Sequence, residues 1–306
     1  MRYGVAMGQK WAKNLTVLSL LIGAFSAAMP QANAQALTPY VANLQFSNRE
    51  EQALNLAREA TQLAQFERYD LALPRALLAV QLAPKSHQAQ WALGTVYLRQ
   101  EKYDQAIATL KLANTLKDNE PAILFNLGAA LLRKGLYGEA IRVLEQGVAI
   151  APNATSGLFD LANALFLSKR YEEAIAKYNR ILELDKKFWA ATNNIGLVEY
   201  ERGNRERAMQ LWKASLEQAE QIEFQAAEPT LALAVAYYTM GDKEKGIKLG
   251  EEAMKIDPRY GRVSHLIENL WGERLIADSK PVLEHPRIKK LIEESERLLP
   301  ISKRRR

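Results

Sequence analysis

Cysteine is absent from all 306 residues of this chain. Its absence excludes disulfides, thiolate metal sites and cysteine nucleophiles, although it does not identify the redox compartment. Histidine is nearly as scarce: His87 lies far along the chain from His265 and His285, so we do not expect the three to converge. The H-E-x-x-H, G-x-S-x-G and P-loop patterns are missing too. We therefore predict no catalytic residue, no cofactor and no metal site, and we do not expect an enzyme.

The chain also lacks a strong excess of charge of either sign. The formal net charge is +6, and Arg2, Lys10 and Lys13 supply half of it, which leaves +3 for the remainder. Acidic and basic residues are interspersed, a pattern that argues against a nucleic-acid groove. Because 48% of the residues are hydrophobic, the chain can bury a core, and its length predicts either two domains or an extended array.

Charged residues are missing altogether from Leu15 to Met29. Basic residues precede this run and the small-x-small sequence of residues 32–34 follows it, which is the order found in a secretory signal. The run is short for a membrane-spanning helix of about 20 residues. No charge follows until Arg49, however, so a retained anchor is the alternative, with a buried core helix as a third possibility. We expect residues 1–34 to associate with a membrane and to direct the body to the periplasm, thylakoid lumen or thylakoid membrane.

Small residues recur along the body with a period of 34 residues. The first series is Gly94, Gly128, Ala162 and Gly196, and the second, twelve residues later each time, is Ala106, Ala140, Ala174 and Ala208. Large residues follow the second series by four positions, namely Leu110, Leu144, Tyr178 and Trp212. Such spacing predicts two antiparallel helices per period, A and B, which cross closely where the small residues lie.

The motif Trp91-Ala92-Leu93-Gly94, followed by Tyr103-Asp104-Gln105-Ala106, resembles the tetratricopeptide repeat (TPR) family, and the resemblance covers residues 53–260. It implies an all-α, right-handed solenoid of about six helix-turn-helix repeats. The predicted units are 53–86, 87–120, 121–154, 155–188, 189–222 and 227–260, with residues 35–52 as a linker. Residues 261–306 are predicted to form capping helices and a basic tail. A first helix over 262–277 would cover the last repeat, and a second over about 285–298 would follow Pro281.

In the TPR family, recurring positions of helix A face a concave groove that holds a partner. The resemblance places the following residues there: Trp91, Phe125, Phe159 and Asn193 at fifth positions; Thr95, Ala129 and Asn163 at ninth; Phe166, Tyr200 and Tyr238 at twelfth; Arg99 and Arg133 at thirteenth. Aromatic side chains with arginine are typical of binding hot spots. The alternative is that these aromatic residues pack against the neighbouring helix.

Two functional hypotheses follow from the exported segment and the groove. The first is a scaffold or assembly factor that binds a protein or peptide partner. The architecture resembles thylakoid TPR assembly factors, including the POR-interacting TPR proteins, which would imply a role in photosynthetic-membrane or pigment–protein biogenesis. The second is an exported periplasmic carrier or envelope-assembly protein that handles a ligand or metal. Neither the identity of the partner nor the oligomeric state is predicted.

Overall fold

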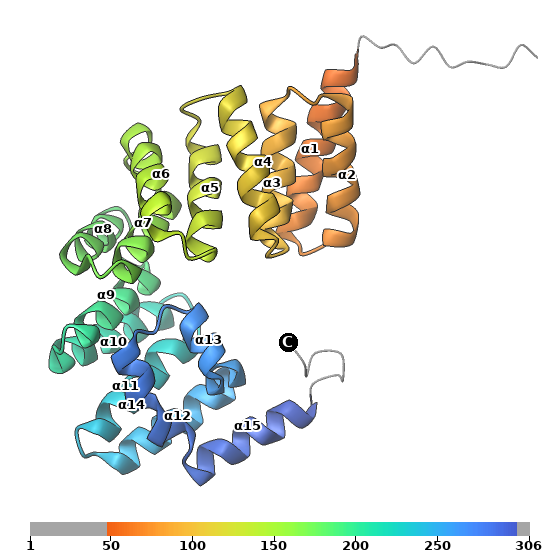
Figure 1. The fold of residues 1–306 in the computed structure, drawn as a ribbon. Coiled ribbons are helices and arrows are strands. Elements are labelled where there is room, and N and C mark those ends of the chain that lie inside the picture. The colour runs from red at the N-terminus through yellow and green to blue at the C-terminus, as the bar shows by residue number, and fades with distance from the viewer. Residues whose placement is uncertain (1–47, 299–306) are drawn as a thin grey trace, which may run out of the picture. The chain divides into compact units, whose positions relative to one another are not determined.

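The computed structural model describes residues 48–298, which form helices joined by short turns, with no strand among them (Figure 1). The all-α fold is therefore confirmed. The predicted signal or anchor of residues 1–34 and the basic tail of residues 303–306 lie outside the described residues. Within the described part of the chain, no helix combines the length and the apolar character needed to cross a membrane.

Six helix pairs follow one another along the chain, one within each predicted unit of the array. The A and B helices are α1 (Arg49–Gln65) with α2 (Tyr69–Leu82), α3 (His87–Arg99) with α4 (Tyr103–Leu116), α5 (Pro121–Arg133) with α6 (Tyr137–Ile150), α7 (Thr155–Leu167) with α8 (Tyr171–Leu184), α9 (Trp189–Glu201) with α10 (Arg205–Glu220), and α11 (Ala227–Thr239) with α12 (Lys243–Ile256). Each pair packs on the next, so the repeats are stacked in file (Figure 1).

The recurring small residues mark the close contact of the two helices in a pair. A methyl group at Gly94 would lie 2.6 Å from Cγ of Leu110, and one at Gly128 would lie 2.4 Å from Cγ of Leu144. At Gly196 it would lie 2.5 Å from Nε1 of Trp212. The large residue on helix B therefore fills the space that glycine leaves open on helix A, as the 34-residue period predicts.

Glycine also serves the turns between the A and B helices of two pairs. Gly135 has a φ of +83° and Gly203 a φ of +93°, values that a side chain disfavours. The four residues that separate the fifth and sixth predicted units lie in the loop between α10 and α11. The helix before this loop, α10, is also longer than the other B helices, at 16 residues.

The C-terminal region differs from the prediction, because a single helix over 262–277 does not form. Instead α13 (Val263–Glu268) ends before α14 (Glu273–Leu283) begins. Leu270 adopts a φ of +66°, and the N–H of Trp271 returns to the carbonyl of Leu266 at 3.0 Å, which closes α13. Pro281 lies inside α14, and α15 (Pro286–Leu298) follows it over the range predicted for the second helix.

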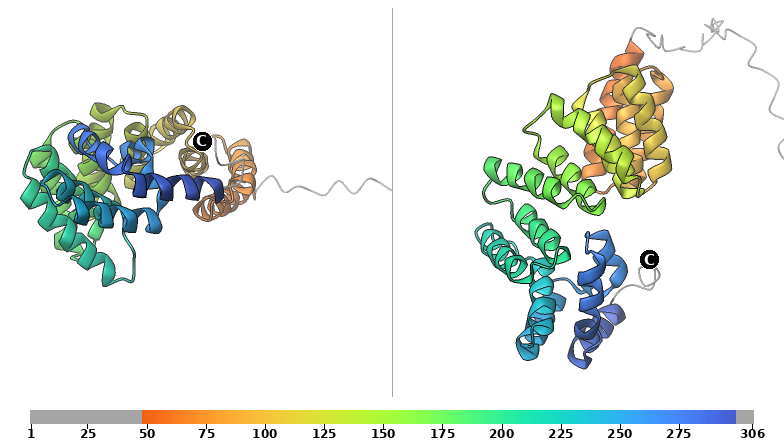
Figure 2. Two further views of the ribbon diagram at one scale, coloured as in Figure 1. Left: turned by 90° about the horizontal axis from the view of Figure 1, so that it is seen from below. Right: turned by 60° about the vertical axis from the view of Figure 1, so that its left-hand side comes forward.

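The C-terminal helices also do more than cover the last repeat. After the 3₁₀ turn η2 (Pro258–Gly261), α14 packs against α9 and α11, which are A helices of two different repeats, whereas α15 packs against α12 (Figure 2). Glu201 on α9 accepts hydrogen bonds from the N–H groups of Arg274 (3.2 Å) and Leu275 (3.0 Å), and so caps α14. The segment is thereby fixed to the A-helix side of the array.

Candidate partner-binding cavity

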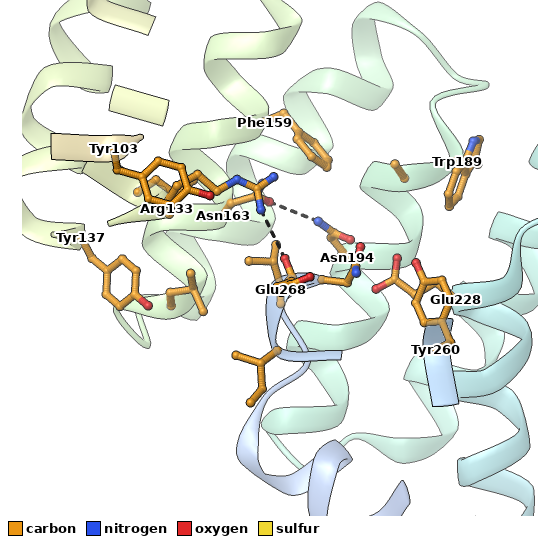
Figure 3. A pocket seen from close by; sticks show the side chains of 16 residues that line it. Tyr103, Arg133, Tyr137, Phe159, Asn163, Trp189, Asn194, Glu228, Tyr260 and Glu268 are labelled. Carbon is orange, nitrogen blue, oxygen red and sulfur yellow. Dashed lines mark hydrogen bonds between the residues drawn. The ribbon is translucent and has the colours of Figure 1, made fainter. Parts of the chain in front are cut away.

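A cavity of about 440 Å³ opens on the A-helix side of the array. Its walls come from the A helices α5, α7, α9 and α11, the first residues of α4 and α6, and the segment from η2 to α13 (Figure 3). The side chains labelled there are Tyr103, Arg133, Tyr137, Phe159, Asn163, Trp189, Asn194, Glu228, Tyr260 and Glu268. Three of the predicted groove residues, Arg133, Phe159 and Asn163, line the cavity together with thirteen residues that were not predicted.

Aromatic rings form much of the cavity wall. Phe159 meets Tyr178 edge-on, with ring centroids 5.8 Å apart, and Phe188 at 5.6 Å. Trp189 stacks on Phe224 at 5.2 Å. These neighbours hold the two lining rings in place and give the cavity an apolar surface that does not have to be assembled when a ligand enters.

A chain of hydrogen-bonded side chains joins two neighbouring repeats behind this surface. The hydroxyl of Tyr178 donates to Oδ1 of Asn163 at 2.5 Å, and Nδ2 of Asn194 donates to the same oxygen at 3.1 Å. Nδ2 of Asn193 donates to Oδ1 of Asn194, also at 3.1 Å. Because these amides are buried and bonded to one another, each is held in one orientation.

Glu228 continues the chain toward the C-terminal segment. It is only 8% exposed, and it accepts hydrogen bonds from Nε1 of Trp271 at 3.2 Å and from Asn193. Burial raises the pKa of the Glu228 carboxyl to about 8, although the two donors oppose that change. The carboxyl is therefore mostly uncharged at neutral pH.

Charged groups lie at the cavity's edge. Arg133 donates from Nη1 to the backbone carbonyl of Glu268 at 3.4 Å, which joins α5 to α13 (Figure 3). Next to Phe159, burial raises the pKa of the Asp160 carboxyl to about 6, and the positive charge of Arg133 partly counteracts the effect. At that value the Asp160 carboxyl is still mostly ionised at neutral pH, but it does not line the cavity, whose inner wall is formed by aromatic rings, amides and Glu228.

Three predicted groove residues are core residues instead. Phe166 is buried against Tyr171, with ring centroids 6.0 Å apart. Tyr200 is fully buried because α14 covers it, and its hydroxyl lies 2.7 Å from the carboxylate of Asp278. Asn193 is fully buried within the hydrogen-bond chain. Their prediction as open groove residues is wrong, because the docked C-terminal segment and the packing between repeats enclose them.

The fifth-position aromatic residues of the earlier repeats fill joints between repeats. Trp91 donates from Nε1 to the carbonyl of Ala122 in the next repeat at 3.3 Å. Phe125 is wedged between Gly147 and Gly157, where added methyl groups would lie 2.6 and 2.2 Å from its ring. Of the three fifth-position aromatic residues, only Phe159 lines the cavity, and the alternative that these rings pack against neighbouring helices holds for Phe125.

The other predicted groove residues lie away from the cavity. Thr95 is half-buried and accepts a hydrogen bond from Asn126 at 2.7 Å, and Ala129 is half-buried as well. Tyr238 lies under the ammonium of Lys243, 5.6 Å from its ring centroid. Arg99 is exposed. Their role in binding a partner stays a prediction.

Sequence reasoning missed Asn194, Glu228 and the segment that carries Tyr260 and Glu268. Asn194 sits directly after Asn193, and Glu228 stands at the start of an apolar stretch that runs to Ala236. A carboxyl beside so many apolar residues is the signal that could have identified Glu228. Among residues 48–298, no group of three or more histidine, aspartate or glutamate side chains is placed to hold a metal ion.

Comparisons with protein-family models agree with this architecture. A model described as tetratricopeptide repeat matches residues 125–187 and 159–222, and a second model with that description matches residues 231–260. The model of anaphase-promoting complex, cyclosome, subunit 3 matches residues 66–147. No curated protein matches the sequence.

Solved structures share the fold at low sequence identity. PilF of Pseudomonas aeruginosa is 17% identical with a TM-score of 0.57, over 69% of this chain and 94% of that one. PilW, a type IV pilus biogenesis factor, is 16% identical with a TM-score of 0.57, over 77% of this chain and 99% of that one. MamA of Desulfovibrio magneticus RS-1 is 18% identical with a TM-score of 0.51, over 56% of this chain and 97% of that one.

At these sequence identities the similar structures indicate the fold of the chain but not its function. None of them supports the resemblance to thylakoid assembly factors of the POR-interacting type. Paired helices at a period of 34 residues run from α1 to α12 and form an all-α helical-repeat solenoid, which the tetratricopeptide-repeat models match over residues 125–222 and 231–260.

Proposed function

We propose that this chain is a protein–protein interaction scaffold that binds a segment of a partner polypeptide in the cavity on its A-helix side. The observation that carries the proposal is the cavity itself, where Phe159 and Trp189 present aromatic surface beside the ordered amide of Asn163. Aromatic groups with a few placed polar groups are typical of binding sites. The proposal assigns no catalytic role to the chain.

The size of the cavity limits what enters it. A volume of about 440 Å³ lies in the range of roughly 300–1,000 Å³ found for pockets that hold small ligands. It therefore accommodates a side chain with its adjoining backbone and excludes a folded domain. Arg133, exposed at the edge, is placed to meet the rest of the partner.

We further propose that the scaffold works in an exported compartment or attached to a membrane. The support is the uncharged run from Leu15 to Met29 with basic residues before it. Cell fractionation followed by N-terminal sequencing tests this part. A mature chain that starts near residue 35 shows a cleaved signal, an intact chain in the membrane fraction shows an anchor, and an intact soluble cytoplasmic chain contradicts both.

Photo-crosslinking tests the binding site. Tyr137 lines the cavity, and Tyr171 holds the same position one repeat later without lining it. Both are half-buried first residues of B helices. We expect p-benzoylphenylalanine in place of Tyr137 to crosslink a discrete partner in cells that make the protein naturally, whereas the same group in place of Tyr171 does not.

Equal crosslinking at both positions, or none at Tyr137, would exclude the cavity as the docking site. The alternative function, an exported carrier for a small ligand, would show itself differently. Native mass spectrometry of the purified chain would then find a bound small molecule, and Tyr137 would yield no crosslinked polypeptide.

A further inference from the structure

We infer that the cavity takes an uncharged apolar or aromatic side chain of the partner, and that the Nδ2 amide of Asn163 donates a hydrogen bond to the backbone carbonyl beside it. The inference rests on the proposed function and narrows the partner to a polypeptide with such an anchor residue. Three features of the described residues lead to it: the orientation of Asn163, the neutrality of the interior and the aromatic walls.

The orientation of Asn163 is fixed by its oxygen. Oδ1 already accepts from the hydroxyl of Tyr178 and from Nδ2 of Asn194, which uses both of its lone pairs. Nδ2 must therefore lie on the other side of the amide. None of the described residues accepts a hydrogen bond from it, and the Asn163 side chain, which is 7% exposed, lines the cavity. A free, oriented N–H₂ group next to a cavity fits a carbonyl oxygen.

Two charged residues that line the cavity, Arg133 and Glu268, are exposed at its edge. Glu228, which also lines the cavity, is kept uncharged at neutral pH by its burial. Arg133 lies at the edge and already donates to the carbonyl of Glu268. A lysine or glutamate side chain that passed this edge and reached Phe159 and Glu228 would lose its hydration, and this penalty favours an uncharged occupant of the interior.

The walls suit an apolar or aromatic ring. Phe159, Trp189 and Tyr260 line the cavity, and the first two are held by ring contacts with Tyr178, Phe188 and Phe224. Asn163 follows Phe159 by four residues on α7, so the amide and the ring lie on the same helix face. A side chain against Phe159 thus brings its backbone carbonyl close to Asn163.

Ligand-observed NMR on the full chain tests the class of ligand with three probes. These are N-acetyl-phenylalanine amide, N-acetyl-glutamate amide and N-acetyl-lysine amide. At pH 7 we expect the phenylalanine probe to bind and the two charged probes to bind at least tenfold more weakly. Equal binding of all three, or preference for a charged probe, would overturn the inference.

A matched pair of variants locates the binding. Ala190 lines the cavity on α9, and Ala122 holds the same repeat position on α5, where it is exposed and does not line it. Ala190→Phe should fill the cavity and abolish binding of the phenylalanine probe, while Ala122→Phe should leave it unchanged. If Ala190→Phe binds the probe as the wild type does, the cavity is not the site.

The hydrogen bond to Asn163 needs its own readout, because Asn163→Leu removes an acceptor used by Tyr178 and Asn194. The probe is therefore labelled with ¹³C at its amide carbonyls. On the wild type, one carbonyl resonance should move downfield on binding, and in a folded Asn163→Leu variant affinity should fall about tenfold, the loss of one hydrogen bond. Unshifted carbonyls on the wild type would refute the role of Asn163.

Failure here is distinguishable from failure of the proposed function. If Tyr137 crosslinks a polypeptide but the phenylalanine probe does not bind, the chain is a scaffold whose partner has another kind of anchor. If neither crosslinking nor probe binding occurs, the scaffold proposal falls as well.

Discussion

Glu228 couples the stability of the protein to pH. Its pKa lies near 8 in the folded chain, above the ordinary value of 4.5 that applies once the chain unfolds. Between these values the folded state holds a proton that the unfolded state has lost. The contribution of Glu228 to stability is thus complete below pH 4.5 and is lost as pH rises through 8, an effect on the order of 5 kcal/mol.

Glu228→Gln isolates this effect, because glutamine stays neutral and keeps an oxygen for Trp271. Urea unfolding at pH 5, 6, 7 and 8 should show the variant gaining stability relative to the wild type as the pH rises. Glu220→Gln, an exposed position on α10, serves as the control and should follow the wild type. A constant difference between Glu228→Gln and the wild type across this range would refute the linkage.

Gly196 faces a rigid side chain that leaves no room for a methyl group. A methyl group there would press on the fully buried indole of Trp212, whose Nε1 also donates to the carbonyl of Asn193 at 3.2 Å. Gly196→Ala should lower the free energy of unfolding by roughly 1–3 kcal/mol. Gly138→Ala is the control, since nothing lies within 4 Å of the added methyl, and it should stabilise by up to about 1 kcal/mol. Chemical denaturation measures both, and equal stabilities would contradict the packing.

At the scale of helices, the docking of α14 depends on its cap. Glu201→Ala leaves the N–H groups of Arg274 and Leu275 without their acceptor, which should cost about 1 kcal/mol. Amide hydrogen exchange should speed up across α14 while α6 keeps its protection. Glu173→Ala removes an exposed ion pair with Arg170 and should cost less than about 0.5 kcal/mol. If Glu201→Ala left amide hydrogen exchange in α14 unchanged, the cap would not be what keeps α14 docked.

The packing of the repeated helices could be predicted from the sequence, whereas the packing of the C-terminal helices, which do not repeat, could not. Gly94 and Leu110 stand 16 residues apart, and the same pairing recurs at Gly128 and Leu144, so their contact can be read from the period. Glu201 and Leu275 meet across 74 residues with no recurring counterpart. Nothing in local spacing indicates that contact, and it decides where α14 lies.

The residues of the candidate cavity also differ in whether they could be predicted from the sequence. Arg133, Phe159 and Asn163 could be predicted because they occupy recurring positions of helix A. Their prediction could not tell them from Tyr200, which occupies an equivalent recurring position and is enclosed by α14. The hydrogen bond between Trp271 and Glu228 depends on the same nonrepeating segment.

At the scale of the whole array, stability should rise from the first repeat toward the last. The residues buried on α1 are all alanines, whereas the core from α4 onward is continuous and contains large residues such as Tyr178 and Trp212. Less apolar area is buried at the start, and the C-terminal helices pack against α9, α11 and α12 of the last two repeats. Hydrogen exchange should therefore be fastest in α1 and α2 and slowest in α9 to α11, and uniform protection would contradict this gradient.

The claim on which the function depends is that a partner polypeptide enters the cavity between the A helices and the C-terminal segment. A crystal structure of the chain bound to the partner segment captured at Tyr137 tests it most directly. The account predicts density for an uncharged side chain against Phe159 and Trp189, with a backbone carbonyl within hydrogen-bond distance of Nδ2 of Asn163. A partner seated on the B helices, with the cavity empty, would contradict it.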